Sequence, residues 1–230
     1  MFVRSELKQQ AKTFMEKHFP QMFLVCLIAG LFTGDIININ FSFDTRSIQV
    51  IIADNIDFNF TVFSSLLLIV GLGASMALTA FIGAPLQQGR VYYFRNITLE
   101  NARVEDLLHS FSTNYLHNVK VLFHRDIRVL LWTLLLIVPG VIKAYEYAFV
   151  DYILNDQPEI EPEEALELSS RMTDGLKLDM FVLDLSFILW DLLSDVLSVF
   201  TLGLSHVALN VYKYQTHAQL YQWVLDNKEV

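Results

Sequence analysis

The stretch LLLIVPGVIKAYEYAFVDYIL, from Leu134 to Leu154, contains the features that decide how this chain folds. It begins as an apolar run of the kind that enters a membrane, and Pro139-Gly140 then interrupts the run. Proline lacks the backbone N–H that a helix interior uses, and glycine adopts turn conformations without steric cost. Three ionisable residues stand in the second half of the run: Lys143, Glu146 and Asp151. The stretch therefore predicts either a kinked membrane helix or a helical hairpin.

The composition of the whole chain indicates a helical membrane protein. Of its 230 residues 53% are hydrophobic and 18% are charged, against roughly 25% charged residues in soluble domains. The formal net charge of −9 argues against nucleic acid as a partner, because binding to phosphates needs basic patches. The single cysteine, Cys26, excludes an internal disulfide and a cysteine-cluster metal site.

The apolar runs predict an all-α fold, a polytopic bundle of membrane helices that forms one integral domain over residues 1–230. Six hydrophobic segments are expected, two of them short and joined at Pro139-Gly140, with amphipathic helices on the membrane surface. The six segments cover about residues 20–37, 62–86, 127–139, 141–154, 178–200 and 202–214. The second segment carries no charge and is long enough to cross ~30 Å of hydrocarbon.

Basic residues predict the orientation of the chain. Residues 1–20 and residues 87–128 together hold ten of the sixteen Lys and Arg, whereas residues 38–60 hold only Arg46. Positive residues stay on the cytoplasmic side of a membrane. We therefore expect a multi-pass protein of the bacterial cytoplasmic membrane with its N-terminus in the cytoplasm.

Two topologies remain for the opening stretch. In one, residues 128–150 cross the membrane once with a kink at Pro139, which places the C-terminus outside. In the other, Pro139-Gly140 is a turn between two short helices that dip into the membrane and return. The second is preferred because it keeps Arg171, Lys177 and Lys213 in the cytoplasm. Lys143 and Glu146 are three residues apart and can pair on one helix face.

Three carboxylates form the candidate functional feature. Asp184, Asp191 and Asp195 have i, i+7, i+11 spacing and fall within about 40° of one another on a helix. With Lys143 counted as their cation, they cannot all be paired, and carboxylates inside a membrane mark ion or proton paths. They are a candidate path of this kind, unless Asp191 and Asp195 lie at a helix end among the headgroups.

The region after Leu130 resembles an uncharacterised family of integral membrane proteins from Gram-positive bacteria, known only as a domain of unknown function. The resemblance lies in a VPG-x-x-K-x-Y-x-Y pattern, an AL-x-x-S pattern and an F-x-LDLSF-x-x-W pattern. The matching residues are Trp132, Pro139, Gly140, Lys143, Tyr145, Tyr147, Asp156, Pro158, Ala165, Leu166, Ser169, Met172, Gly175, Lys177, Phe181, Asp184, Ser186, Trp190 and Tyr221. It is specific from about residue 130 to 190 and looser elsewhere. The family supplies no catalytic residues.

The sequence predicts a non-enzymatic membrane scaffold or accessory subunit. It contains none of the GxxxxGK[ST], HExxH, GxSxG or GxGxxG motifs, and no catalytic, cofactor-binding or metal-binding residues are expected. The expected partners are the lipid bilayer and other membrane helices, from a second copy or another protein. The alternative function is a small transporter or channel that uses the three carboxylates.

Overall fold

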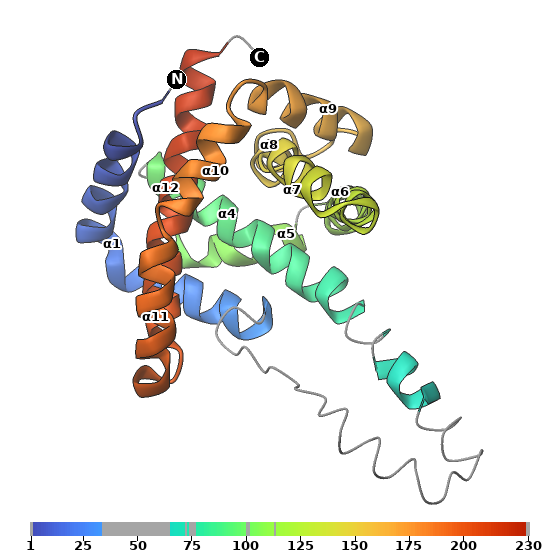
Figure 1. The fold of residues 1–230 in the computed structure, drawn as a ribbon, viewed down its shortest axis with the longest axis horizontal. Coiled ribbons are helices and arrows are strands. Elements are labelled where there is room, and N and C mark those ends of the chain that lie inside the picture. The colour runs from blue at the N-terminus through green and yellow to red at the C-terminus, as the bar shows by residue number, and fades with distance from the viewer. Residues whose placement is uncertain are drawn as a thin grey trace, which may run out of the picture.

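The protein is helical throughout the part of the chain that the computed structural model describes, residues 2–33, 65–71, 73, 77–99, 102–112 and 114–228 (Figure 1). This confirms the expected all-α class. The α-helices are α1 (Arg4–Thr33), α4 (Ala84–Thr98), α5 (His109–Ser112), α6 (Tyr115–Leu135), α7 (Ile137–Glu146), α8 (Val150–Asp156), α9 (Pro162–Thr173), α10 (Lys177–Leu185), α11 (Ile188–Thr201) and α12 (Leu204–Asn227). A π-helical segment, η1 (Thr79–Gly83), precedes α4, and a 3-10 segment, η2 (Val104–Leu108), precedes α5.

Helix α12 is the centre of the bundle. It packs along α1 and also against α11 and α4. Its buried face includes Val211 and Tyr221, which join Phe94 of α4 in the hydrophobic core. Arg90 is almost fully buried here, and its guanidinium lies 3.9 Å from the centre of the Tyr214 ring. Burial of an arginine over an aromatic face provides a cation–π contact that offsets part of the desolvation cost.

Helix α1 runs past Pro20 and changes direction along its length (Figure 1). Proline removes one backbone hydrogen bond and crowds the preceding turn, which bends a helix. The N-terminal half carries the basic residues and the second half contains the expected apolar segment 20–37, of which residues 34–37 lie outside the described residues.

Helices α6 and α7 form a hairpin, but its break is at Leu136 and not at Pro139-Gly140. Leu136 has extended backbone angles, and α7 begins with the next residue. Pro139 therefore lies in the first turn of α7, where its missing N–H would have no intrahelical acceptor. Gly140 is buried against α6, where a Cβ would lie 2.2 Å from the Thr133 hydroxyl oxygen. The proline sets where α7 begins, and the glycine lets the two helices touch.

The expected segment 178–200 is two helices instead of one. Helix α10 ends at Leu185, and α11 begins at Ile188 after a short break at Ser186 and Phe187. The chain then reverses into α12 through Leu202 and Gly203, which have φ angles of +52° and +85°. Glycine adopts this left-handed conformation without strain, so a tight turn can form here. Helix α12 continues to Asn227, well past the end expected at residue 214.

None of the helices in the described ranges is at once long enough and apolar enough to cross a membrane. The expected segment 62–86 is described only in part, because residues 62–64, 72 and 74–76 lie outside the described residues.

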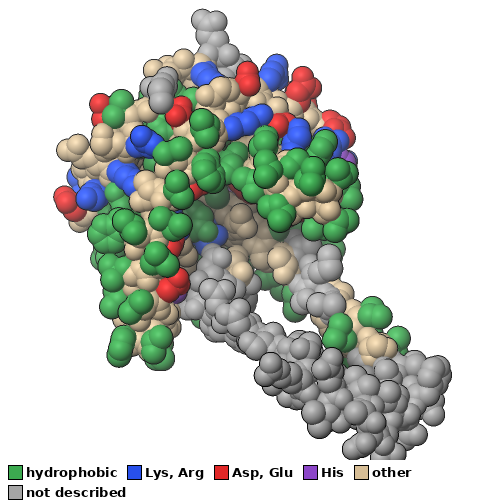
Figure 2. All heavy atoms as spheres, in the orientation of Figure 1, with side chains coloured by type: hydrophobic (Ala, Val, Ile, Leu, Met, Phe, Trp, Pro, Cys, Tyr) green, Lys and Arg blue, Asp and Glu red, His purple; other side chains and the backbone are tan. Residues whose placement is uncertain are grey.

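Apolar and charged side chains gather in different places on the surface. Figure 2 shows hydrophobic side chains over the α6–α7 hairpin and over the lower part of α11, and most of the charged side chains toward the upper part of the molecule. Most of the charged surface therefore lies away from two apolar projections, although Asp191 and Asp195 lie on α11 beside one of them.

Candidate functional site

The two apolar projections are the hairpin tips of the structure. We call residues 130–138 the α6–α7 tip, and residues 196–204 the α11–α12 tip. Their side chains are among the most exposed hydrophobic groups described, with Leu134 83% and Leu202 87% exposed. Contiguous apolar surface of this kind marks an interaction site in a protein or membrane contact.

An ionic clasp lies at the base of the α6–α7 hairpin. Glu146 is buried at the end of α7, with its two carboxylate oxygens 2.6 Å from Lys143 Nζ and 2.9 Å from Lys177 Nζ. The pairing of Lys143 with Glu146 is the one expected from their spacing. Lys177, at the start of α10, is a partner that the spacing argument did not include. The clasp connects the α6–α7 hairpin to α10.

Two hydroxyl groups of α9 fix the backbone at the same place. Ser169 Oγ donates a hydrogen bond of 2.8 Å to the Glu146 carbonyl oxygen and accepts one of 3.2 Å from the Phe149 N–H. Thr173 Oγ1 donates to the same carbonyl at 3.2 Å. The carbonyls at the end of a helix have no intrahelical partners, so these bonds satisfy a buried helix end. Ser169, Lys143 and Lys177 belong to the sequence pattern described above, and these contacts explain their place in it.

The three carboxylates do not form an unpaired stripe. Asp184 lies on α10, whereas Asp191 and Asp195 lie on α11 beyond the break, so the single-helix geometry does not apply. Each is paired with a base on α12, and we call the set the acid–base ladder. The three pairs are Asp184 with His217 at 2.8 Å, Asp191 with Lys213 at 2.5 Å and Asp195 with His206 at 3.3 Å.

Asp184 also has a second partner, on α7. Tyr145 Oη of α7 donates a hydrogen bond of 2.8 Å to Asp184 Oδ2, while Lys143 is held by Glu146. Asp184 therefore connects α7, α10 and α12. Because Asp184 accepts a hydrogen bond from Tyr145 and contacts His217, the argument for an unpartnered carboxylate that carries ions does not apply to it.

The sequence argument counts only Lys143 as a cation for the three acids, whereas their bases lie on α12. His206, Lys213 and His217 have the same i, i+7, i+11 spacing as the acids and thus also share one helix face. Complementary stripes on two neighbouring apolar segments were the signal that could have paired them. No group of three or more His, Cys, Asp or Glu side chains in the described parts of the chain is arranged to hold a metal ion.

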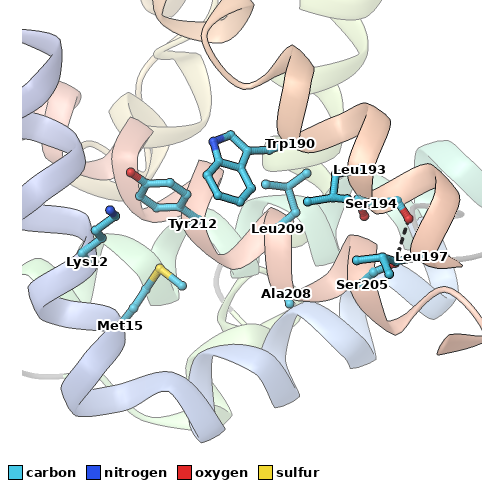
Figure 3. Close-up of a pocket in the computed structure, with 10 residues that line it drawn as sticks. All are labelled: Lys12, Met15, Trp190, Leu193, Ser194, Leu197, Ser205, Ala208, Leu209 and Tyr212. Carbon is cyan, nitrogen blue, oxygen red and sulfur yellow. Dashed lines mark hydrogen bonds between the residues drawn. The ribbon is translucent and has the colours of Figure 1, made fainter.

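A pocket lies beside the ladder, between α1, α11 and α12 (Figure 3). Its volume is about 390 Å³, within the ~300–1,000 Å³ of small-molecule sites. The lining is Lys12, Met15, Trp190, Leu193, Ser194, Leu197, Ser205, Ala208, Leu209 and Tyr212. Figure 3 shows the Lys12 amine and the Tyr212 hydroxyl at one end and the two serines at the other. The pocket is apolar between these ends.

A family model described as "Protein of unknown function (DUF975)" matches residues 125–228. The matched region begins within α6 and contains the whole α6–α7 tip, the clasp, the acid–base ladder and the α11–α12 tip. This agrees with the expected resemblance to an uncharacterised domain family. No curated protein and no solved structure matches the chain.

Proposed function

We propose that this protein is a non-enzymatic membrane scaffold of a Gram-positive bacterium, held in the cytoplasmic membrane by its two hairpin tips. The observation that carries the proposal is the concentration of exposed apolar side chains on these tips, Leu134 and Leu202 above all. Exposed apolar side chains are unfavourable in water, but they have no such free-energy cost in the hydrocarbon of a bilayer. The tips would enter the hydrocarbon from one side and return.

The break in the α6–α7 tip keeps a backbone hydrogen bond on each of its two sides. The break at Leu136 is brief, because the Leu136 N–H donates to the Trp132 carbonyl at 3.0 Å and the Gly140 N–H donates to the Leu136 carbonyl at 3.2 Å. Satisfied backbone groups are the main requirement for a chain that enters lipid. The clasp and the acid–base ladder then keep the two hairpins in a fixed arrangement, which suits a platform for other membrane helices.

The proposed orientation places the charged part of the molecule in the cytoplasm. It is supported by the basic residues of residues 1–20 and 87–128. A Lys17→Cys variant in a Cys26→Ser background should resist an impermeant thiol reagent in intact cells and react after lysis. Equal labelling before and after lysis would contradict the orientation.

The function is tested by the binding of purified protein to liposomes. Leu134→Asp should weaken binding at least about tenfold, because an aspartate costs ~3 kcal/mol at the bilayer centre and less at shallower depth. Leu116→Asp is the matched control, since Leu116 is 73% exposed and lies at the opposite end of the same helix. Equal binding of both variants would contradict insertion of the α6–α7 tip.

A further inference from the structure

The pocket between α1, α11 and α12 has an amphipathic lining. Its apolar walls are formed by side chains such as Met15, Leu193 and Leu209. The end that holds Lys12 and Tyr212 is polar (Figure 3). Neither of these two side chains donates a hydrogen bond or forms an ion pair with another residue of the described ranges. The pocket therefore offers a hydrocarbon-lined space with two free donors at one end.

The polar end carries the positive charge of Lys12. Arg4, Lys8 and Lys12 lie four residues apart on α1 and thus share one face. Burial first, and then the neighbouring charges of Arg4 and Lys12, lower the pKa of Lys8 below its ordinary value of 10.5. The negative charge of Asp191 is offset by Lys213, which forms an ion pair with it. An anionic group fits this end of the pocket by charge.

The pocket opens onto the apolar surface of α11. Trp190, Leu193 and Leu197 line the pocket and are also exposed by 55%, 49% and 43%. An occupant can therefore enter sideways from surroundings that are themselves apolar. If the α11–α12 tip lies in the membrane, the group that meets this opening is a lipid acyl chain.

We propose that this pocket holds one acyl chain of an anionic phospholipid, with the lipid phosphate bound by the Lys12 ammonium and the Tyr212 hydroxyl. The inference rests on the proposed membrane insertion and adds a specific lipid site to it. The apolar walls accept the chain, and the two donors select the headgroup. A cation next to a membrane surface contributes ~1 kcal/mol to binding an anionic lipid, which corresponds to about fivefold selectivity.

The experiment uses tryptophan fluorescence in vesicles, because Trp190 lines the pocket and Trp132 lies on the α6–α7 tip. One variant keeps only Trp190 (W132F and W223F), and the other keeps only Trp132 (W190F and W223F). The probes are phosphatidylglycerol and phosphatidylcholine with brominated acyl chains, each added to unbrominated phosphatidylcholine vesicles. Bromine quenches tryptophan only on contact, so the quenching of each variant reports lipid at one place.

Brominated phosphatidylglycerol should quench Trp190 at about one fifth of the concentration that brominated phosphatidylcholine requires, and the two lipids should quench Trp132 equally. Lys12→Gln should abolish the preference at Trp190, whereas Lys17→Gln on the same helix should keep it. Equal quenching of Trp190 by both lipids, or the same loss with Lys17→Gln, would overturn the lipid site and leave membrane insertion standing. Preference for a brominated free fatty acid over the phospholipid would also overturn it. Absence of quenching at Trp132 and Trp190 would overturn both proposals.

Discussion

Gly140 lies so close to Thr133 that a Cβ atom at this glycine would stand 2.2 Å from the Thr133 hydroxyl oxygen and 2.6 Å from its Cα. Two helices can approach to this extent only where one of them lacks a side chain. The contact explains why α6 and α7 lie side by side immediately after the break at Leu136. Thr133 Oγ1 also donates to the Val129 carbonyl at 2.8 Å, so its hydroxyl cannot rotate away without losing a bond.

Gly140→Ala should therefore destabilise the protein by about 1–3 kcal/mol, the usual cost of overpacking. Denaturant unfolding in detergent micelles measures this free energy. Gly83→Ala is the control, because a Cβ there meets its nearest atom, Thr79 Cγ2, at 3.6 Å, an ordinary contact. A Gly140→Ala variant as stable as Gly83→Ala would show that the hairpin does not need the close approach.

The clasp gives a second prediction. Glu146→Gln should lower the free energy of unfolding by about 1.5–3 kcal/mol, since hydrogen bonds to charged groups contribute this much and two lysines lose their counterion. Glu167→Gln is the control, because it makes the same chemical change on the exposed face of α9, outside the clasp. Equal unfolding free energies for the two variants would contradict a structural role for the clasp.

The acid–base ladder predicts that Asp191→Asn lowers the stability of the fold. If Asp191 were an unpaired buried charge, the same substitution would raise the stability. The pair with Lys213 is partly exposed, 39% at the aspartate and 29% at the lysine. Solvent screening therefore limits its coupling to about 0.2–1 kcal/mol in a double-mutant cycle with Lys213→Met. A rise in stability on Asp191→Asn would mean that the carboxylate is not paired.

Glu163 supplies a pH-dependent contact between α9 and α6. Its hydrogen bond with Arg128, and then the one with His124, hold the pKa of the Glu163 carboxyl below its ordinary value of 4.5. A lowered pKa stabilises the fold above pH 4.5, and this contribution is lost as pH falls through the folded-state pKa. Glu163→Gln should thus be less stable than wild type at neutral pH, and the difference should vanish in acid. A difference that persists at every pH would contradict the contact.

The sequence predicted the helical class and the existence of a hairpin because proline and glycine inside an apolar run leave few other structures. The position of the break could not be derived, since proline is tolerated in the first turn of a helix. In the structure, the chain breaks at Leu136, three residues before Pro139. The spacing of Lys143 and Glu146 sufficed to predict their contact, because that contact is local to one helix.

Contacts between helices were harder to predict. The spacing of Asp184, Asp191 and Asp195 suggests one stripe only if one helix carries all three, and the break at Ser186 and Phe187 separates them. The sequence does not show which residues of α11 and α12 face each other. The partners of the three aspartates, His206, Lys213 and His217, are therefore indicated in the sequence only by their identical spacing. The insertion of the tips into a membrane stays a prediction.

The central claim, that the α6–α7 tip enters the membrane, is tested most directly with a nitroxide spin label at Leu136→Cys in a Cys26→Ser background. In bilayers, collisions of the label with oxygen should be frequent and collisions with a water-soluble nickel chelate rare, because oxygen partitions into hydrocarbon. A label at Leu116→Cys, on the far end of the same helix, should show the reverse. Frequent collisions of the nickel chelate with a label at residue 136, equal to those at residue 116, would contradict the account.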